Sequence, residues 1–297
     1  IDLSSQRNEY VFRVPTVLRR IGLRLLLDER DEPAFHLLCN VLCTTVPAAV
    51  LLHAFSVQSH LLGLVYFVVN YVLFLQRFLL TLHYTEHRRL FKPGCSWLNH
   101  LAPYLLSPLF GDNAWGWDLS STEGFRRDSL ACFAFYWLRF LLVSAVELPL
   151  YALRRRRNSH AAAAAASMAA GWLLTAALWQ RCAVATFYTL LLPYLVTSLA
   201  LMFGNWSQHI FVDPDTPRDD FKLTYNCLAC PDNPKTYNDG YHIIHHVNSN
   251  CTGLELHDSK DGEWPTKPLQ QCRQYPLEAL GLWSQPAGAP LEQQGRP

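Results

Sequence analysis

Two groups of histidines have a spacing that would place imidazole rings on one side of a helix. His83 and His87 are four residues apart, and His242, His245 and His246 lie at positions i, i+3 and i+4. Side chains at these separations are neighbours on an α-helix, about 5–6 Å apart at Cβ. Each group could therefore hold a metal ion. Sites rich in imidazole and poor in thiolate suit iron, zinc, copper or nickel.

Taken singly, each histidine group has a plain structural explanation. Surface histidines reach the HxxxH spacing by chance, and a histidine at the end of an apolar run can be an interface residue. Three imidazoles in five residues are rarer. His209, which follows an apolar run in the sequence Asn205–His209, is a further candidate. All of these histidines lie just beyond an apolar run or in the polar chain after it, which favours a common site.

Long apolar runs around the histidines predict a membrane protein. Of the 297 residues, 50% are hydrophobic and 16% are charged, whereas a soluble domain has about 25% charged residues. A membrane-spanning helix needs about 20 mainly apolar residues. Five runs approach this length, at 37–55, 61–82, 130–153, 161–179 and 183–203. The 25 Lys+Arg against 24 Asp+Glu leave a net charge of +1, which excludes a strongly basic nucleic-acid binder.

The basic residues around the first two runs predict a hairpin with both ends on the cytosolic or stromal side. Six arginines precede the first run and three basic residues follow the second, whereas the turn at 56–60 contains neither Lys nor Arg. The run at 130–153 carries Arg139 and Glu147 and ends in four arginines. We therefore expect this third run to lie in the interface or to dip into the membrane.

The last two apolar runs would then form a second hairpin. The alternative is that the run at 130–153 spans the membrane and the alanine-rich stretch at 161–170 does not. The predicted fold is an all-α, multi-span membrane helical bundle, with about four transmembrane helices in two hairpins and a cytosolic cap lined by histidines.

The composition divides the chain into three segments. Residues 1–33 are expected to be a cytosolic N-terminal segment. We expect this segment to be truncated, because the sequence begins with Ile rather than Met. Residues 34–258 are expected to form the membrane domain, and 259–297 a loose tail rich in Pro and Gln. The nine cysteines are irregularly spaced, which is not typical of a disulfide framework.

The histidine pattern and its flanks resemble the membrane fatty acid desaturases over residues 35–258. His83 and His87 resemble the first histidine box of that family, GNWSQHIFVDPD resembles the isolated site, and NDGYHIIHH resembles the third box. The resemblance implies that Asn205 acts on the metal through water. The metal ligands that it implies are His83, His87, His209, His242, His245 and His246.

The resemblance also implies a function. Membrane fatty acid desaturases introduce a double bond into an acyl chain with O2 and a non-haem di-iron centre on the cytosolic face. No side chain abstracts hydrogen from an unactivated methylene, so a cofactor must carry that step. The implied partners are an acyl lipid substrate, an electron donor such as cytochrome b5 or ferredoxin, and the membrane lipids. The implied location is the endoplasmic reticulum or a plastid membrane.

One feature of that family is missing from the sequence. A second histidine box is expected between the first box and the next apolar run, but 106–122 contains no histidine. Two iron ions need more donors than the six predicted imidazoles. His100 and His257 are candidate substitutes, although no spacing argues for them. The intact DLSSTEGFRRDS that follows favours a clean excision, by an incomplete sequence or a genuine deletion.

Two other functions stay open at this point. A membrane di-iron hydroxylase of sterols, carotenoids or acyl chains would carry the same histidine boxes. A non-catalytic relative that binds lipid would explain the missing box. A histidine-rich segment in the gene between the codons for Phe110 and Asp118 would favour the enzyme. The sequence leaves the substrate and the position of the new bond undetermined.

Overall fold

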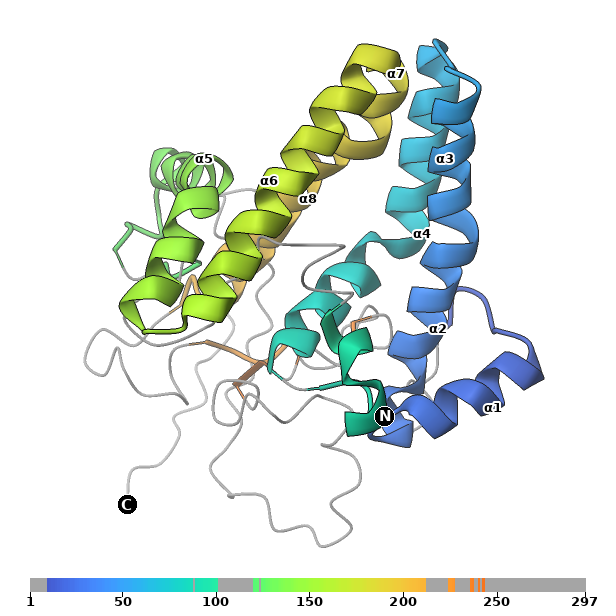
Figure 1. The fold of residues 1–297 in the computed structure, drawn as a ribbon. Helices are drawn as coiled ribbons and strands as arrows, with labels where there is room; N and C mark the ends of the chain where they lie inside the picture. Colours follow the sequence, from blue (N-terminus) through green and yellow to red (C-terminus); the bar gives the residue numbers. More distant parts are fainter. Residues whose placement is uncertain are drawn as a thin grey trace, which may run out of the picture.

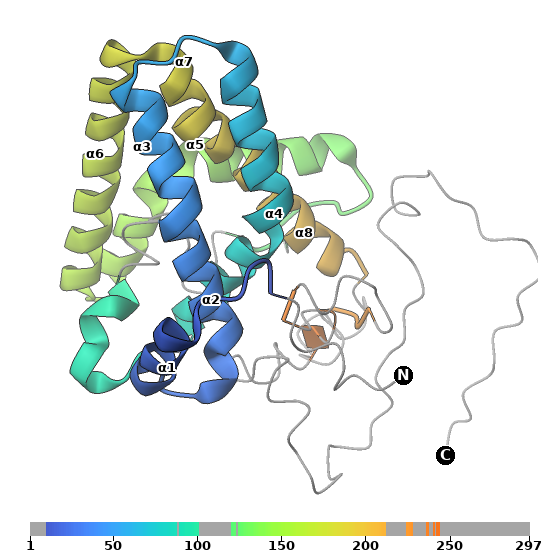
Figure 2. The same ribbon diagram turned by 90° about the vertical axis from the view of Figure 1, so that its right-hand side faces the viewer.

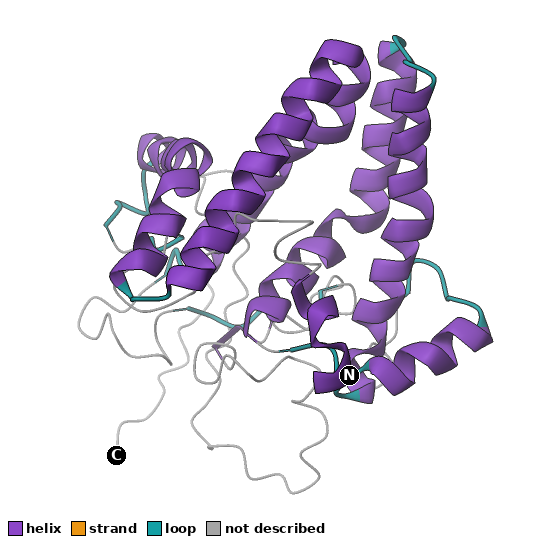
Figure 3. Ribbon diagram, viewed as in Figure 1, coloured by secondary structure: helices purple, strands orange, loops and turns teal. Residues whose placement is uncertain are grey.

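The computed structural model describes residues 10–87, 89–100, 120–122, 124–211, 224–227, 236–237, 240 and 242–243. In these parts of the chain the regular structure is helical, apart from an isolated bridge between Leu26 and Phe91 (Figure 3). Five helices are long and apolar enough to cross a membrane. The prediction of an all-α, multi-span bundle is confirmed.

The first two apolar runs lie side by side and antiparallel, as predicted (Figure 1). One arm is continuous through α2 (Glu32–Asn40), a π-helical turn (Val41–Thr45) and α3 (Val46–Ala54). The other arm is α4 (His60–His87), which continues beyond its apolar part. The last two runs also form the predicted hairpin, described next.

The second hairpin turns at a single residue. α6 (Asn158–Arg181) is followed, after Cys182, by α7 (Ala183–Thr186), a π-helical turn (Phe187–Leu191) and α8 (Leu192–Gln208). Cys182 is buried, and its Sγ donates to the carbonyl oxygen of Val57 at 3.2 Å. We call this end of the bundle, where both hairpins turn, the tip. The opposite end is called the inner end.

Both π-helical turns end two residues before a proline. Pro47 and Pro193 have no backbone N–H, so the carbonyl four residues earlier lacks its usual α-helical partner. The chain responds with wider turns: the N–H of Val46 donates to Val41 and that of Leu192 to Phe187. A π turn keeps the helix continuous across such a position. One arm of each hairpin is therefore widened in the same way.

The third run forms α5 (Leu130–Arg154), whose first part lies across the bundle and whose last part runs beside α6 (Figure 1). Its first part crosses the direction of α3, α4 and α6 in Figure 2. The Ser129 side chain caps its start by accepting from the N–H of Cys132 at 3.3 Å. Arg139 donates to both carboxylate oxygens of Glu147 at 3.0 Å, so two charges within the apolar run are paired.

By length and composition α5 counts as a fifth candidate span, one more than the predicted four. That this run lies in the interface or only dips into the membrane stays a prediction. Pro149 interrupts the hydrogen bonding of its last turns.

The two hairpins touch near the tip. Gly63 of α4 lies against Tyr188, so closely that a Cβ at position 63 would be 2.2 Å from the Tyr188 ring. The Nε2 of His53 and the Oγ1 of Thr189 are 3.0 Å apart in the same region. The absence of a side chain at Gly63 thus permits the close approach of the hairpins.

Replacing Gly63 with alanine is expected to destabilise the protein by about 1–3 kcal/mol, because the Tyr188 ring must move. The same change in a Tyr188→Ala background should cost much less. Gly171→Ala is the matched control: its Cβ meets open space, and alanine favours a helix by up to about 1 kcal/mol. The thermal unfolding midpoint in detergent measures all four variants. Equal losses in both backgrounds would contradict the close contact.

Candidate functional site

The first histidine group lies at the inner end of the bundle. α4 remains helical to His87, so the positions of His83 and His87 share a helix face, as the spacing predicts. The side chains of these two residues lie outside the described part of the structure. The same is true of His100, whose backbone ends a 3-10 helix (Pro93–His100).

The isolated histidine, His209, and the first histidine of the third group, His242, meet at this end. His209 follows directly on the last residue of α8, and its ring centroid is 5.5 Å from that of His242, with the planes at 67°. His242 is 6% exposed. With metal–nitrogen bonds of about 2 Å, two imidazoles on one ion have centroids roughly 4.5–6.5 Å apart. The observed separation therefore fits a shared ion.

Backbone and side-chain hydrogen bonds attach the segment around His242 to the end of α8. The hydroxyl of Thr224 donates to the carbonyl of Gln208 at 2.6 Å. Asn226 is fully buried and accepts from the N–H of Ile243 at 3.0 Å. The N–H of Cys227 donates to the carbonyl of Gly240 at 2.7 Å. These bonds determine where the third histidine group begins.

A buried tyrosine attaches the same segment to α4. The hydroxyls of Tyr237 and Thr81 are 2.9 Å apart, and both side chains are buried. Burial raises the pKa of Tyr237 to about 12. Tyr237 has φ of 51°, which is rare for a bulky residue and marks a tightly determined turn. Thr81 lies two residues before His83 and Tyr237 five residues before His242, so this contact holds the chain that leads to His242 against the end of α4.

Tyr237 was missed in the sequence analysis. It lies four residues before Tyr241, the tyrosine of the NDGY sequence that precedes the third histidine box, in a segment that is otherwise polar. An aromatic residue in such a segment was a usable signal, because it needs an apolar partner. The structure provides Leu80 of α4 as that partner.

Asn205 has a structural role that the sequence did not reveal. Its side-chain amide nitrogen donates to the carbonyl of Ser120 at 2.6 Å and to the hydroxyl of Tyr136 at 2.8 Å. The Tyr136 hydroxyl donates to the same carbonyl at 2.8 Å. Asn205 thus links α8 to α5 and to the segment that follows the missing histidine box. Its action on a metal through water stays a prediction.

Tyr136 also belongs to the apolar cluster that joins α5 and α8. This cluster has Tyr136, Phe140, Met202 and Trp206 as its buried members. The rings of Tyr136 and Trp206 are 5.3 Å apart. The crosswise helix α5 therefore supports α8 one turn before His209, and the position of that histidine depends on it.

His245, His246 and His257 lie outside the described residues. Where side chains are described, no three His, Cys, Asp or Glu residues are close enough to hold a metal ion. The structure thus places two of the six predicted ligands side by side, His209 and His242, and positions the backbone of two more at the same end.

Comparison with known proteins identifies one relationship. Residues 111–261 match a family model described as "Fatty acid desaturase". The matched range covers about half of the chain and includes His209 and the third histidine group. The chain matches no curated protein and no solved structure.

Proposed function

Since the chain belongs to the fatty acid desaturase family, we propose that it is a membrane oxidoreductase that introduces a double bond into an acyl chain with iron and O2. The observation that supports this best is the contact between the His209 and His242 rings, 5.5 Å apart. Three chain segments that are distant in sequence supply histidines to one end of the bundle.

The proposed metal centre lies at the inner end. A bound iron centre would supply the O2 chemistry that no side chain can perform. Tyr237 and Thr81 hold the third histidine group against α4, and Asn205 and Tyr136 hold the end of α8. We also propose that Asn205 acts on the metal through water rather than as a direct ligand. The proposed direct ligands are His83, His87, His209, His242, His245 and His246.

Family membership implies an acyl substrate, and the five long apolar helices indicate a multi-pass membrane protein. We propose that electrons arrive from a carrier such as cytochrome b5 or ferredoxin. The proposed location is the endoplasmic reticulum or a plastid membrane. In this arrangement the acyl chain lies among the apolar helices with its reacting carbons at their inner end.

The metal centre that we propose for this 297-residue chain lacks some of its ligands. The sequence has no histidine between His100 and His160, where the family carries its second box. Six imidazoles leave coordination positions of two iron ions without a protein donor. We therefore propose that this form holds fewer than two iron ions and turns over slowly.

Lipid profiling of a host that expresses the chain tests this proposal. A form with the gene-derived segment restored between Phe110 and Asp118 is expected to raise the content of unsaturated acyl chains in an O2-dependent way. The 297-residue form is expected to raise that content much less. His242→Ala in the longer form is the matched inactive control.

Each alternative function has its own result in that experiment. Hydroxylated lipids in place of unsaturated ones would identify a hydroxylase. Unchanged lipids with both forms, despite full membrane insertion, would favour the non-catalytic relative. Equal desaturation by both forms would show that the 297-residue form has a complete metal centre. A residue such as His100 would then be a ligand that the proposed set omits.

A further inference from the structure

A short amphipathic helix lies across the inner end of the first hairpin. α1 (Thr16–Leu25) runs at a steep angle to α2 and α3 in Figure 1 and not alongside them. The sequence analysis did not predict it, because it is shorter than the apolar runs. Its sequence, TVLRRIGLRL, contains three arginines and no acidic residue.

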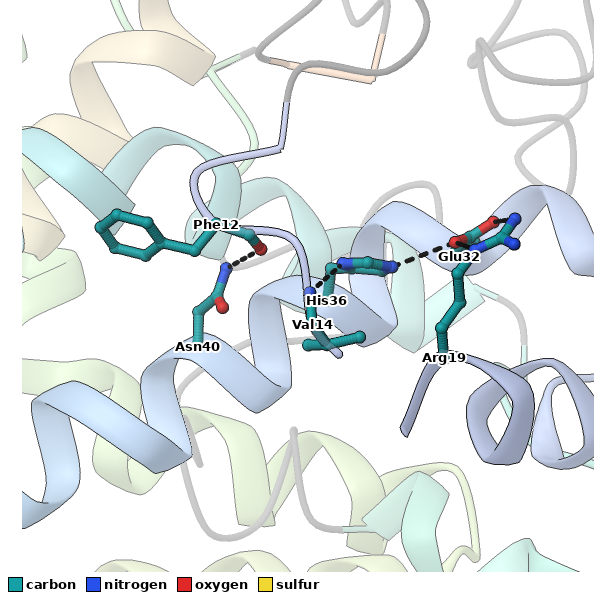
Figure 4. A network of polar contacts seen from close by, with 6 residues as sticks. All are labelled: Phe12, Val14, Arg19, Glu32, His36 and Asn40. Atoms are coloured by element: carbon teal, nitrogen blue, oxygen red, sulfur yellow. Dashed lines mark hydrogen bonds and ion pairs between the residues drawn. The ribbon is translucent and has the colours of Figure 1, made fainter. Parts of the chain in front are cut away.

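Specific contacts hold α1 at this angle. A Cβ at Gly22 would lie 2.4 Å from the Phe35 ring, so only glycine permits the approach to α2. Arg19 forms a forked ion pair with Glu32, with 2.9 Å between Nη2 and Oε2. Glu32 also contacts Nε2 of His36 at 3.0 Å, and the N–H of Val14 donates to Nδ1 of that ring at 3.0 Å (Figure 4).

The segment after α4 extends this surface. The N–H of Leu27 donates to Leu90 and that of Lys92 to Leu25, each at 2.9 Å. The ammonium group of Lys92 donates to the carbonyl of Arg24 at 2.9 Å. Trp97 in the adjoining 3-10 helix is 63% exposed. Tryptophan is enriched where a membrane meets water.

The exposed side of α1 carries an apolar stripe beside a basic stripe. Val17 is 70% and Ile21 is 46% exposed. These two residues are four apart and share a face. Arg20 and Arg24, also four apart, lie on the neighbouring face and are exposed. Arg19 is excluded from this basic stripe because Glu32 binds it.

We propose that α1 is an in-plane anchor that binds anionic phospholipids of the adjacent leaflet. Val17 and Ile21 enter the region where acyl chains meet headgroups, and Arg20 and Arg24 bind lipid phosphates. The charge complementarity of this helix to an anionic surface, together with its exposed aliphatic stripe, is typical of interfacial helices. An acidic soluble partner would account for the exposed arginines but not for the exposed aliphatic stripe.

A second basic element lies at the same end of the bundle. Arg154–Arg157 form the turn between α5 and α6, and all four are exposed. Figure 1 places this turn and α1 at the lower ends of the two hairpins. An anionic leaflet would contact both. This proposal does not depend on the proposed enzymatic activity.

Lipid titration of the purified full-length chain in detergent tests the anchor. The thermal unfolding midpoint is followed with phosphatidylglycerol, with phosphatidylcholine and with soluble glycerol phosphate. Phosphatidylglycerol is expected to raise the midpoint at lower concentrations than phosphatidylcholine, and glycerol phosphate is expected to have no effect. The preference should weaken with added salt.

Variants identify the residues responsible. Arg20→Gln with Arg24→Gln is expected to weaken the response to phosphatidylglycerol about 25-fold, about fivefold for each arginine, with the phosphatidylcholine response unchanged. Arg20→Lys with Arg24→Lys keeps the charge and should keep the preference, which separates charge loss from misfolding. Arg181→Gln, an exposed arginine at the tip, is the matched control.

Three results would overturn the proposal. An unchanged lipid preference in the double glutamine variant would exclude the arginines. An equal response to glycerol phosphate would assign them to a free anion. An unchanged response to both lipids after Val17→Ser with Ile21→Ser would show that the aliphatic stripe does not enter the membrane.

Discussion

Replacing His242 with alanine is expected to lower the iron affinity of the chain by at least about tenfold, the loss that even an outer-shell change causes in metal sites. His209→Ala should have a similar effect, because the two rings lie 5.5 Å apart and fit one shared ion. Iron per chain, measured against a competing chelator, is the readout. His160→Ala is the matched control, since this exposed histidine lies at the start of α6.

The double variant decides whether the two histidines act together. If they hold the same ion, the combined loss should differ from the sum of the single losses, because contacting residues couple. Full iron retention by either single variant would exclude that histidine as a ligand. Unchanged helix content by circular dichroism in each variant separates metal loss from misfolding.

Tyr237→Ala is expected to release the third histidine group from α4 at a local cost of about 3–5 kcal/mol, as for other buried aromatic truncations. The ring is 7% exposed, packs on Leu80 and shares a hydrogen bond with Thr81. Hydrogen exchange of residues 224–243 should rise sharply, while the helices near the tip keep their protection. Equal exchange throughout the chain would contradict a local role.

Alkaline pH should produce a weaker form of the same release. Burial raises the pKa of Tyr237 to about 12, against about 10 for an unfolded tyrosine. The folded segment therefore holds its proton more tightly than the released one. This contribution is complete below about pH 10 and is lost as pH rises towards 12. Tyr237→Phe should cost about 1 kcal/mol and remove this pH dependence.

The two hairpins were predictable because long apolar runs determine helices without help from neighbours. The distribution of basic residues predicted that both ends of the first hairpin lie on one side, and the structure shows such a hairpin. The helical spacing of His83 and His87 was equally local, and α4 does continue through both. These features depend on nearby residues alone.

Features that depend on distant partners were not predictable in this way. The side-chain amide nitrogen of Asn205 donates to the backbone carbonyl of Ser120, a residue far away in the sequence. Because every residue type has a backbone carbonyl, the sequence does not mark this partner. The place of Tyr237 depends on Thr81 and Leu80 of α4. The pairing of Arg139 with Glu147 was not predictable either, because a separation of eight residues is not a usual helical pair.

The one-residue turn at Cys182 constrains how the protein is synthesised. α6 ends at Arg181 and α7 begins at Ala183, so a single residue separates the two arms. We therefore expect the two arms to enter the bilayer together, as one hairpin. The bond from Cys182 to Val57 joins the turns of the two hairpins, so it can form only when both hairpins are present.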